Sequence, residues 1–240
     1  MATTSIEWTE STWNPVTGCT KISSGCANCY AERMARRLKA MGTPKYANGF
    51  KVTIHEDCLT EPYSWKKPKV IFVNSMSDMF HENIPLEFIK KVFNVMNNNP
   101  QHIFQVLTKR AELLLKYSTE LNWASNIWMG VTVEDFKAKR RIDYLRQTKA
   151  AVKFLSCEPL ISDLGELNLE KINWVIVGGE SGPKSRPIKE DWVLDIYQQC
   201  KDSDIPFFFK QWGGVNKKKN GKELKGEIYQ EMPEMIESWM

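Results

Sequence analysis

Nearly continuous apolar runs alternate with helical patterns along most of this chain, and no other feature constrains its fold as strongly. The strand candidates, rich in β-branched and aromatic residues, are Lys69–Asn74, His102–Leu107, Asn126–Val131, Ala151–Leu155, Ile172–Val177 and Pro206–Lys210. Apolar residues recur at helical spacing in Leu86–Met96, Ala111–Leu121, Asp135–Gln147 and Asp191–Lys201. Apolar runs without polar alternation are typical of parallel strands buried on both faces. We expect an α/β fold with about six parallel strands, as a full or partial (β/α) barrel or an open doubly wound sheet.

The chain is expected to form a single domain over residues 1–240, because no linker rich in Pro, Gly or Ser interrupts the pattern. It has no apolar run near the roughly 18 residues that a membrane helix needs, so no membrane partner is expected. Its first residues lack the basic and apolar segments of a signal peptide. A cytoplasmic location follows as an expectation, in which cysteine thiols stay reduced and available to metal.

Polar residues follow each of the six strand candidates. The segments are Asn74–Asp78, Thr108–Arg110, Thr132–Glu134, Ser156–Pro159, Gly178–Ser181 and Lys210–Gly214. The carboxyl ends of parallel strands meet at one edge of a sheet, so these segments are expected to form one site. Glu158 and Glu180 are candidate catalytic carboxylates, which could also bind a divalent ion in a nucleotide-processing enzyme. His81 is a candidate acid or base.

Three cysteines, Cys19, Cys26 and Cys29, lie in one polar loop that runs into an amphipathic helix, within an N-terminal segment of about residues 14–40. Three thiolates can ligate three irons of a cubane cluster and leave the fourth iron open. The alternative is a structural zinc site completed by His55 or Cys58, because Cys-x2-Cys is a common zinc half-site. The spacing leaves both possibilities open.

Basic residues cluster close to several of the expected strand ends, although the formal net charge is only +4. The candidates for contacts with nucleic acid are Lys109, Arg110, Lys184, Arg186 and Lys210. The chain also has 9 Trp residues, and basic groups interleaved with aromatic rings suit single-stranded DNA or RNA. A solvated surface over a Trp-rich core explains the same composition, so a non-catalytic zinc- and nucleic-acid-binding protein remains the alternative function.

The cysteine loop and the β/α pattern together resemble the radical S-adenosylmethionine superfamily. Seven blocks in order also resemble the phage-encoded gp thirty-seven/sixty-eight family, described as three-Cys-motif proteins: Trp13–Cys19, Cys26–Ala31, Phe72–His81, Leu107–Arg110, Phe154–Leu160, Val177–Gly182 and Phe209–Gly214. The match runs from about Glu7 to the C-terminus. It departs from the commonest superfamily spacing, because Thr20–Gly25 lengthens the first interval between cysteines.

The resemblance implies a radical S-adenosylmethionine enzyme that modifies or repairs a nucleic-acid base or nucleotide. It implies a [4Fe-4S] cluster on Cys19, Cys26 and Cys29, with S-adenosylmethionine at the open iron. The residues that it implies for contact with S-adenosylmethionine are Tyr30, Asn74, Ser75, Ser77, Thr132 and Glu134. A reductant protein, and a second protein encoded nearby, are further implied partners.

Overall fold

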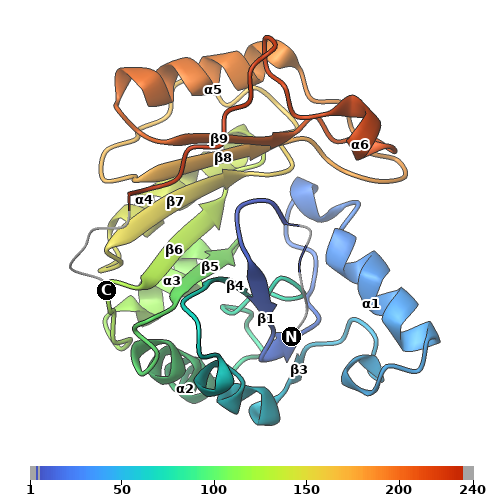
Figure 1. Cartoon of the computed structure of the whole chain (residues 1–240), viewed down its shortest axis with the longest axis vertical. Helices are drawn as coiled ribbons and strands as arrows, with labels where there is room; N and C mark the ends of the chain where they lie inside the picture. Colours follow the sequence, from blue (N-terminus) through green and yellow to red (C-terminus); the bar gives the residue numbers. More distant parts are fainter. Residues whose placement is uncertain (1–3, 5, 235–240) are drawn as a thin grey trace.

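The computed structural model describes residue 4 and residues 6–234, and its main feature is a curved, all-parallel sheet (Figure 1). The 7 strands lie side by side in chain order: β1 (Ser11–Trp13), β4 (Val70–Val73), β5 (Ile103–Thr108), β6 (Ile127–Thr132), β7 (Val152–Cys157), β8 (Trp174–Gly178) and β9 (Phe207–Gln211). Within the described residues no pairing joins β9 back to β1, so the sheet is a partial barrel. The predicted α/β class and partial barrel are confirmed.

β1 is the strand that the apolar pattern did not reveal, so the sheet has one strand more than expected. Its three residues pair in parallel with Ile71–Val73 of β4. A run this short has no periodicity to read, and pairing with a longer neighbour is what makes it a strand. The segment that carries β2 (Val16–Thr17) and then the three cysteines follows β1.

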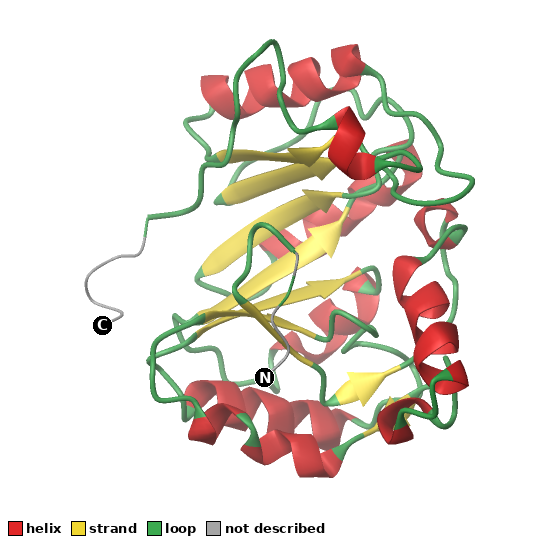
Figure 2. Cartoon of the chain, turned by 45° about the vertical axis from the view of Figure 1, so that its right-hand side comes forward, coloured by secondary structure: helices red, strands yellow, loops and turns green. Residues whose placement is uncertain are grey.

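Helices connect the strands and cover the outer face of the sheet, as Figure 2 shows. The α-helices are α1 (Tyr30–Ala40), α2 (Leu86–Asn97), α3 (Ala111–Ser118), α4 (Arg140–Arg146), α5 (Glu190–Asp202) and α6 (Lys217–Asn220). The short 3-10 helices are η1 (Ser24–Cys26), η2 (Pro44–Tyr46), η3 (Glu56–Thr60), η4 (Pro62–Ser64) and η5 (Phe136–Lys139). The helix expected over Asp135–Gln147 therefore divides into η5 and α4, and the one expected to reach Leu121 ends at Ser118.

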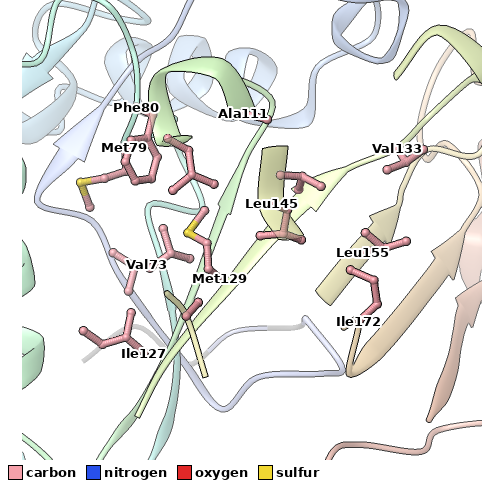
Figure 3. Close-up of a cluster of buried hydrophobic side chains, with 14 of the residues drawn as sticks. Val73, Met79, Phe80, Ala111, Ile127, Met129, Val133, Leu145, Leu155 and Ile172 are labelled. Carbon is pink, nitrogen blue, oxygen red and sulfur yellow. The ribbon is translucent and has the colours of Figure 1, made fainter. Parts of the chain in front are cut away.

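The larger core lies between the sheet and its outer helices (Figure 3). Met129 of β6 and Leu155 of β7 point into it from the sheet, and Leu145 enters from α4. All three side chains are fully buried. Burial of each large aliphatic side chain stabilises the fold by about 1.5–3 kcal/mol, so this layer holds the strands in the order that places their carboxyl ends together.

A second apolar cluster fills the concave face of the sheet. Trp8 packs with its ring centroid 4.7 Å from that of Phe72 and 6.3 Å from that of Trp174. The segment that carries Trp8 is held in the hollow, because Gln105 Nε2 donates to the Trp8 carbonyl at 3.3 Å and the Glu10 amide donates to Val70 at 3.0 Å. The hollow of the barrel thus has a largely apolar floor, and many polar groups line the pocket at its mouth.

A small antiparallel sheet lies at the start of the cysteine loop. It pairs β2 (Val16–Thr17) with β3 (Thr53–Ile54). An isolated bridge between Gly18 and Ser77 then ties this loop to the segment after β4. No helix in the described part of the chain is long and apolar enough to cross a membrane.

Candidate functional site

One pocket of about 580 Å³ opens at the carboxyl ends of the strands. Every one of the six polar segments that follow the predicted strands contributes to its lining: Asn74–Asp78, Thr108–Arg110, Thr132, Ser156 with Glu158 and Pro159, Gly179–Ser181, and Lys210 with Gln211. The expectation that these segments meet at one edge of the sheet is confirmed. Asn74 and Gln211 are 137 positions apart in the sequence and line one pocket because parallel strands align their carboxyl ends.

All three thiols of the cysteine loop line this pocket, so the structure brings Cys19, Cys26 and Cys29 to the same mouth. Cys29 is the N-cap residue of α1, which fixes the end of the loop. Among the described residues, no three His, Cys, Asp or Glu side chains form a group that could hold a single metal ion.

The donor set fits a cluster better than a single zinc ion. Three thiolates on a cubane bind three different irons and leave the fourth iron open, whereas a structural zinc ion takes four protein ligands. The described lining contains no fourth Cys and no His. Cys58, one predicted fourth ligand, is buried under Lys45, whose Nζ lies 2.9 Å from its sulfur, and His55 lies 2.8 Å from the Thr17 hydroxyl. Neither of these groups reaches the pocket.

The surroundings of the thiols differ in their effect on proton affinity. Burial, with a smaller contribution from Asp78, raises the pKa of Cys19 to about 11, and Arg110 acts in the opposite direction. Burial would also raise the pKa of Cys26, but Lys109 and hydrogen bonds from Ile22 and Ser23 outweigh it and lower this pKa. Since metals bind thiolates, binding at Cys19 must release a firmly held proton.

Arg110 lies under the cysteine loop and is 7% exposed. Its Nη1 donates to Cys19 Sγ at 3.4 Å and to Asp78 Oδ2 at 3.2 Å, and its Nε donates to Glu82 at 2.9 Å. Nη2 donates to the carbonyl of Thr20 at 3.2 Å and to its hydroxyl at 3.0 Å. A guanidinium has five N–H donors, so the structure engages all of them and leaves none for a phosphate.

The residues after β4 hold the cysteine loop in place. Asn74 adopts a positive φ of 60° and accepts a hydrogen bond from the Val16 amide at 3.2 Å. Ser77 donates to the Val16 carbonyl at 2.9 Å, and Ser75 donates to Asn14 Oδ1 at 3.2 Å. These three residues line the pocket as expected, while the side-chain bonds of all three anchor the chain between β1 and the first cysteine.

The two residues predicted after β6 have different surroundings. Thr132 lines the pocket, and its hydroxyl accepts from Lys109 Nζ at 3.3 Å. Glu134 is fully buried outside the lining and pairs with Arg141 at 2.6 Å. A Cβ on Gly25 would approach Glu134 Cγ to 2.9 Å. Glu134 therefore supports the cysteine loop from below, and only glycine at position 25 allows this close contact.

Glu158 and Lys210 form an ion pair on the wall of the pocket. Lys210 Nζ lies 2.9 Å from Glu158 Oε1, and the two side chains are 16% and 15% exposed. A Cβ on Gly178 would lie 2.8 Å from the same carboxylate oxygen, so the glycine makes room for the pair. A carboxylate beside an ammonium presents an acceptor and a donor together to whatever occupies the pocket.

Glu180 joins the segment after β8 to the cysteine loop. It accepts from Asn28 Nδ2 at 2.9 Å and pairs with Arg186 at 2.6 Å. Burial would raise the pKa of Glu180, but the hydrogen bonds from Arg186 and Asn28 lower it below its ordinary value. Arg186 is thus committed to Glu180, whereas Lys184 lies outside the pocket lining and accepts from Asn28 through its carbonyl at 2.9 Å.

Two aromatic candidates differ in exposure. Tyr30 lines the pocket and is 58% exposed, so its ring is available at the mouth. His81 is 3% exposed, lies outside the lining, and has its Nε2 2.9 Å from the hydroxyl of Thr20. Burial, reinforced by the charge of Arg110, lowers the pKa of His81, which keeps the imidazole neutral at pH 7. His81 contacts the cysteine loop and not the pocket.

Sequence reasoning gave no role to Asn28 or Asp78. Asn28 stands between the last two cysteines, and Asp78 ends the polar segment after β4, so a signal was present for both. Asp78 accepts from the Thr108 hydroxyl at 2.6 Å and from the Lys109 amide at 3.1 Å. Both residues bind neighbours of the thiols and so determine where the loop lies.

No curated protein matches the sequence. A mutant spore photoproduct lyase with bound AdoMet and dinucleoside spore photoproduct is 10% identical, with a TM-score of 0.45 over 78% of this chain and 60% of that one. Spore photoproduct lyase complexed with dinucleoside spore photoproduct is 11% identical, with a TM-score of 0.42 over 77% of this chain and 59% of that one. This chain thus spans about three fifths of each of these proteins.

A family model covers almost the whole chain. The match extends over residues 3–233, and the family is described as "Protein of unknown function (DUF5131)". The description does not mention phages, so the phage origin remains a prediction. Because the match covers far more than half of the sequence, the chain belongs to the DUF5131 family.

Proposed function

We propose that this protein is an iron–sulfur enzyme of the radical S-adenosylmethionine type that modifies or repairs a nucleic-acid base or nucleotide. The observation that carries the proposal is the pocket at the strand ends, which is lined by Cys19, Cys26, Cys29 and polar groups from six other strand ends. Ligands of β/α proteins bind at this edge. Three thiolates without a fourth protein ligand suit a [4Fe-4S] cluster with one open iron.

The three cysteines would hold three irons of the cluster. When bound together, the cluster and S-adenosylmethionine would supply one-electron reductive cleavage of the sulfonium. The apolar floor formed by Trp8 and Phe72 excludes water from the bottom of the pocket. At the mouth, the hydroxyl of Thr132, which accepts from Lys109, could bind the ribose of S-adenosylmethionine.

The substrate would lie against the opposite wall, where Glu158 and Lys210 offer an acceptor and a donor. The edge of a nucleobase also carries hydrogen-bond donors and acceptors, so it could pair with these two side chains. Tyr30 presents an exposed ring on which a base could stack. Lys109 at the pocket and exposed Lys184 beside it are the charges that we propose for a phosphate backbone.

The test is anaerobic reconstitution with iron and sulfide. Wild-type protein should hold about four irons per chain, show iron–sulfur absorbance, and convert S-adenosylmethionine to 5′-deoxyadenosine and methionine under strong reductant. Stoichiometric zinc without binding of S-adenosylmethionine would contradict the proposal. Binding of DNA or RNA oligonucleotides by the same preparation tests the substrate class separately.

A further inference from the structure

All the N–H donors of Arg110 are used inside the protein, so a role in binding phosphate does not explain this residue. It is buried and paired with Asp78, which is 6% exposed. Asp78 is itself fixed, because it accepts from the hydroxyl of Thr108 at 2.6 Å and from the amides of Lys109 and Phe80 at 3.1 and 3.0 Å. A carboxylate held by three donors cannot turn, so the guanidinium that it binds has one orientation.

That orientation directs one N–H of Arg110 at the sulfur of Cys19. Nη1 lies 3.4 Å from Sγ, while Nη2 holds the next residue, Thr20, through both its carbonyl and its hydroxyl at 3.2 and 3.0 Å. The side chain therefore fixes the backbone beside the cysteine and donates to its sulfur. Within the described residues, no charged donor makes such a hydrogen bond to the sulfur of Cys26 or Cys29.

We propose that Arg110 is a positioning residue for Cys19, and that its N–H donor to the Cys19 sulfur raises the reduction potential of the cluster. This inference rests on the proposed function for the cluster itself. Hydrogen bonds to ligand sulfurs and nearby positive charge favour the reduced, more negative state of an iron–sulfur cluster. Asp78 acts one step further away, by orienting the guanidinium.

The experiment compares two double variants that each keep the total charge of the protein. D78N/R110Q removes both charges of the pair and the donor to Cys19. E56Q/K91Q removes an ion pair whose atoms lie 3.0 Å apart and which lies outside the lining of the pocket. Reduction potentials of the reconstituted proteins are measured by redox titration followed by electron paramagnetic resonance.

D78N/R110Q should reduce the ratio of reduced to oxidised cluster at least tenfold at a fixed potential, which is a shift of about 59 mV for one electron. E56Q/K91Q should leave the potential unchanged. An equal shift in both variants, or none in D78N/R110Q, would overturn the role of Arg110. If D78N/R110Q does not fold, R110K keeps the charge beside Asp78 but lacks the planar fork, and it should move the potential in the same direction.

The outcomes distinguish this inference from the proposed function. Wild-type protein that holds a cluster whose potential does not respond to Arg110 overturns only the positioning role. Wild-type protein that takes up no cluster after reconstitution overturns both. Iron content is measured on every variant, so a lost cluster is never read as a shifted potential.

Discussion

Asn28 and Glu180 are 152 positions apart in the sequence, yet Asn28 Nδ2 donates to Glu180 Oε2 at 2.9 Å. The contact joins the cysteine loop, which follows the first strand of the sheet, to the segment after β8, which neighbours the last strand. Arg33 of α1 adds a second link by donating to the Ser181 carbonyl at 2.8 Å. Side chains thus connect the two ends of the partial barrel at its mouth, where no strand pairing does so in the described residues.

The link predicts that Glu180 stabilises the fold. E180Q should lower the free energy of unfolding by about 1–2 kcal/mol at pH 7, because a buried charged acceptor is lost to Asn28 and Arg186. Chemical denaturation measures this difference. E190Q is the matched control, since Glu190 is 43% exposed in its pair with Lys225, and it should change stability by less than about 0.5 kcal/mol.

The same carboxylate predicts a pH dependence. The folded-state pKa of Glu180 is lowered, so its contribution is present above the unfolded pKa of about 4.3 and disappears as pH falls through the folded pKa. The stability difference between wild type and E180Q should therefore be largest near pH 7 and shrink in acid. A difference that grows as pH falls would show that the carboxylate is not held as an anion in the folded protein.

Three of the six cysteines should be required for the cluster, and the other three should not. Changing Cys19, Cys26 or Cys29 to Ala should abolish iron–sulfur absorbance after reconstitution, because each would ligate a different iron. The controls are changes to Ala at Cys58, Cys157 and Cys200, which are buried away from the pocket and should leave the spectrum largely unchanged. Full retention of the cluster in C29A would contradict the assignment of the three ligands.

The close contact at Gly25 predicts that a larger residue at this position reduces the amount of cluster that the protein binds. In G25A the new methyl would meet Glu134 Cγ at 2.9 Å. Because Glu134 is fully buried and paired with Arg141, we expect the loop, and Cys26 with it, to shift. Cluster content should fall several-fold while far-UV circular dichroism stays unchanged. In G165A no atom lies within 4 Å of the new methyl, although φ is +56°. This control should cost about 1 kcal/mol of stability through backbone strain without loss of iron.

Lys109 and Lys184 predict that the binding of nucleic acid depends on salt concentration. If the pocket meets single-stranded nucleic acid, K109A/K184A should reduce the slope of log affinity against log salt by about 0.7 per lost contact. K91A is the control, because Lys91 lies on α2 and pairs with Glu56 at 3.0 Å. Fluorescence anisotropy at several salt concentrations measures the slopes. An unchanged slope in K109A/K184A would remove these two lysines from the interface.

The sequence by itself determined the α/β class, six of the seven strands and the common edge at which the polar segments meet. These features are local, because continuous apolar runs predict buried parallel strands and each polar segment directly follows its own strand. The clustering of Cys19, Cys26 and Cys29 was visible for the same reason. β1 was not predicted, because a strand of three residues is too short to show a hydrophobic pattern.

Only the tertiary structure determined which partner each polar side chain has. Arg110 and Arg186 look alike in the sequence as basic residues near strand ends, but Asp78 and Glu180 bind them inside the protein. Lys109, one position before Arg110, remains at the pocket. The physical reason is that an ion pair depends on distance and burial across different strands, and a pattern of residue types along one segment contains neither.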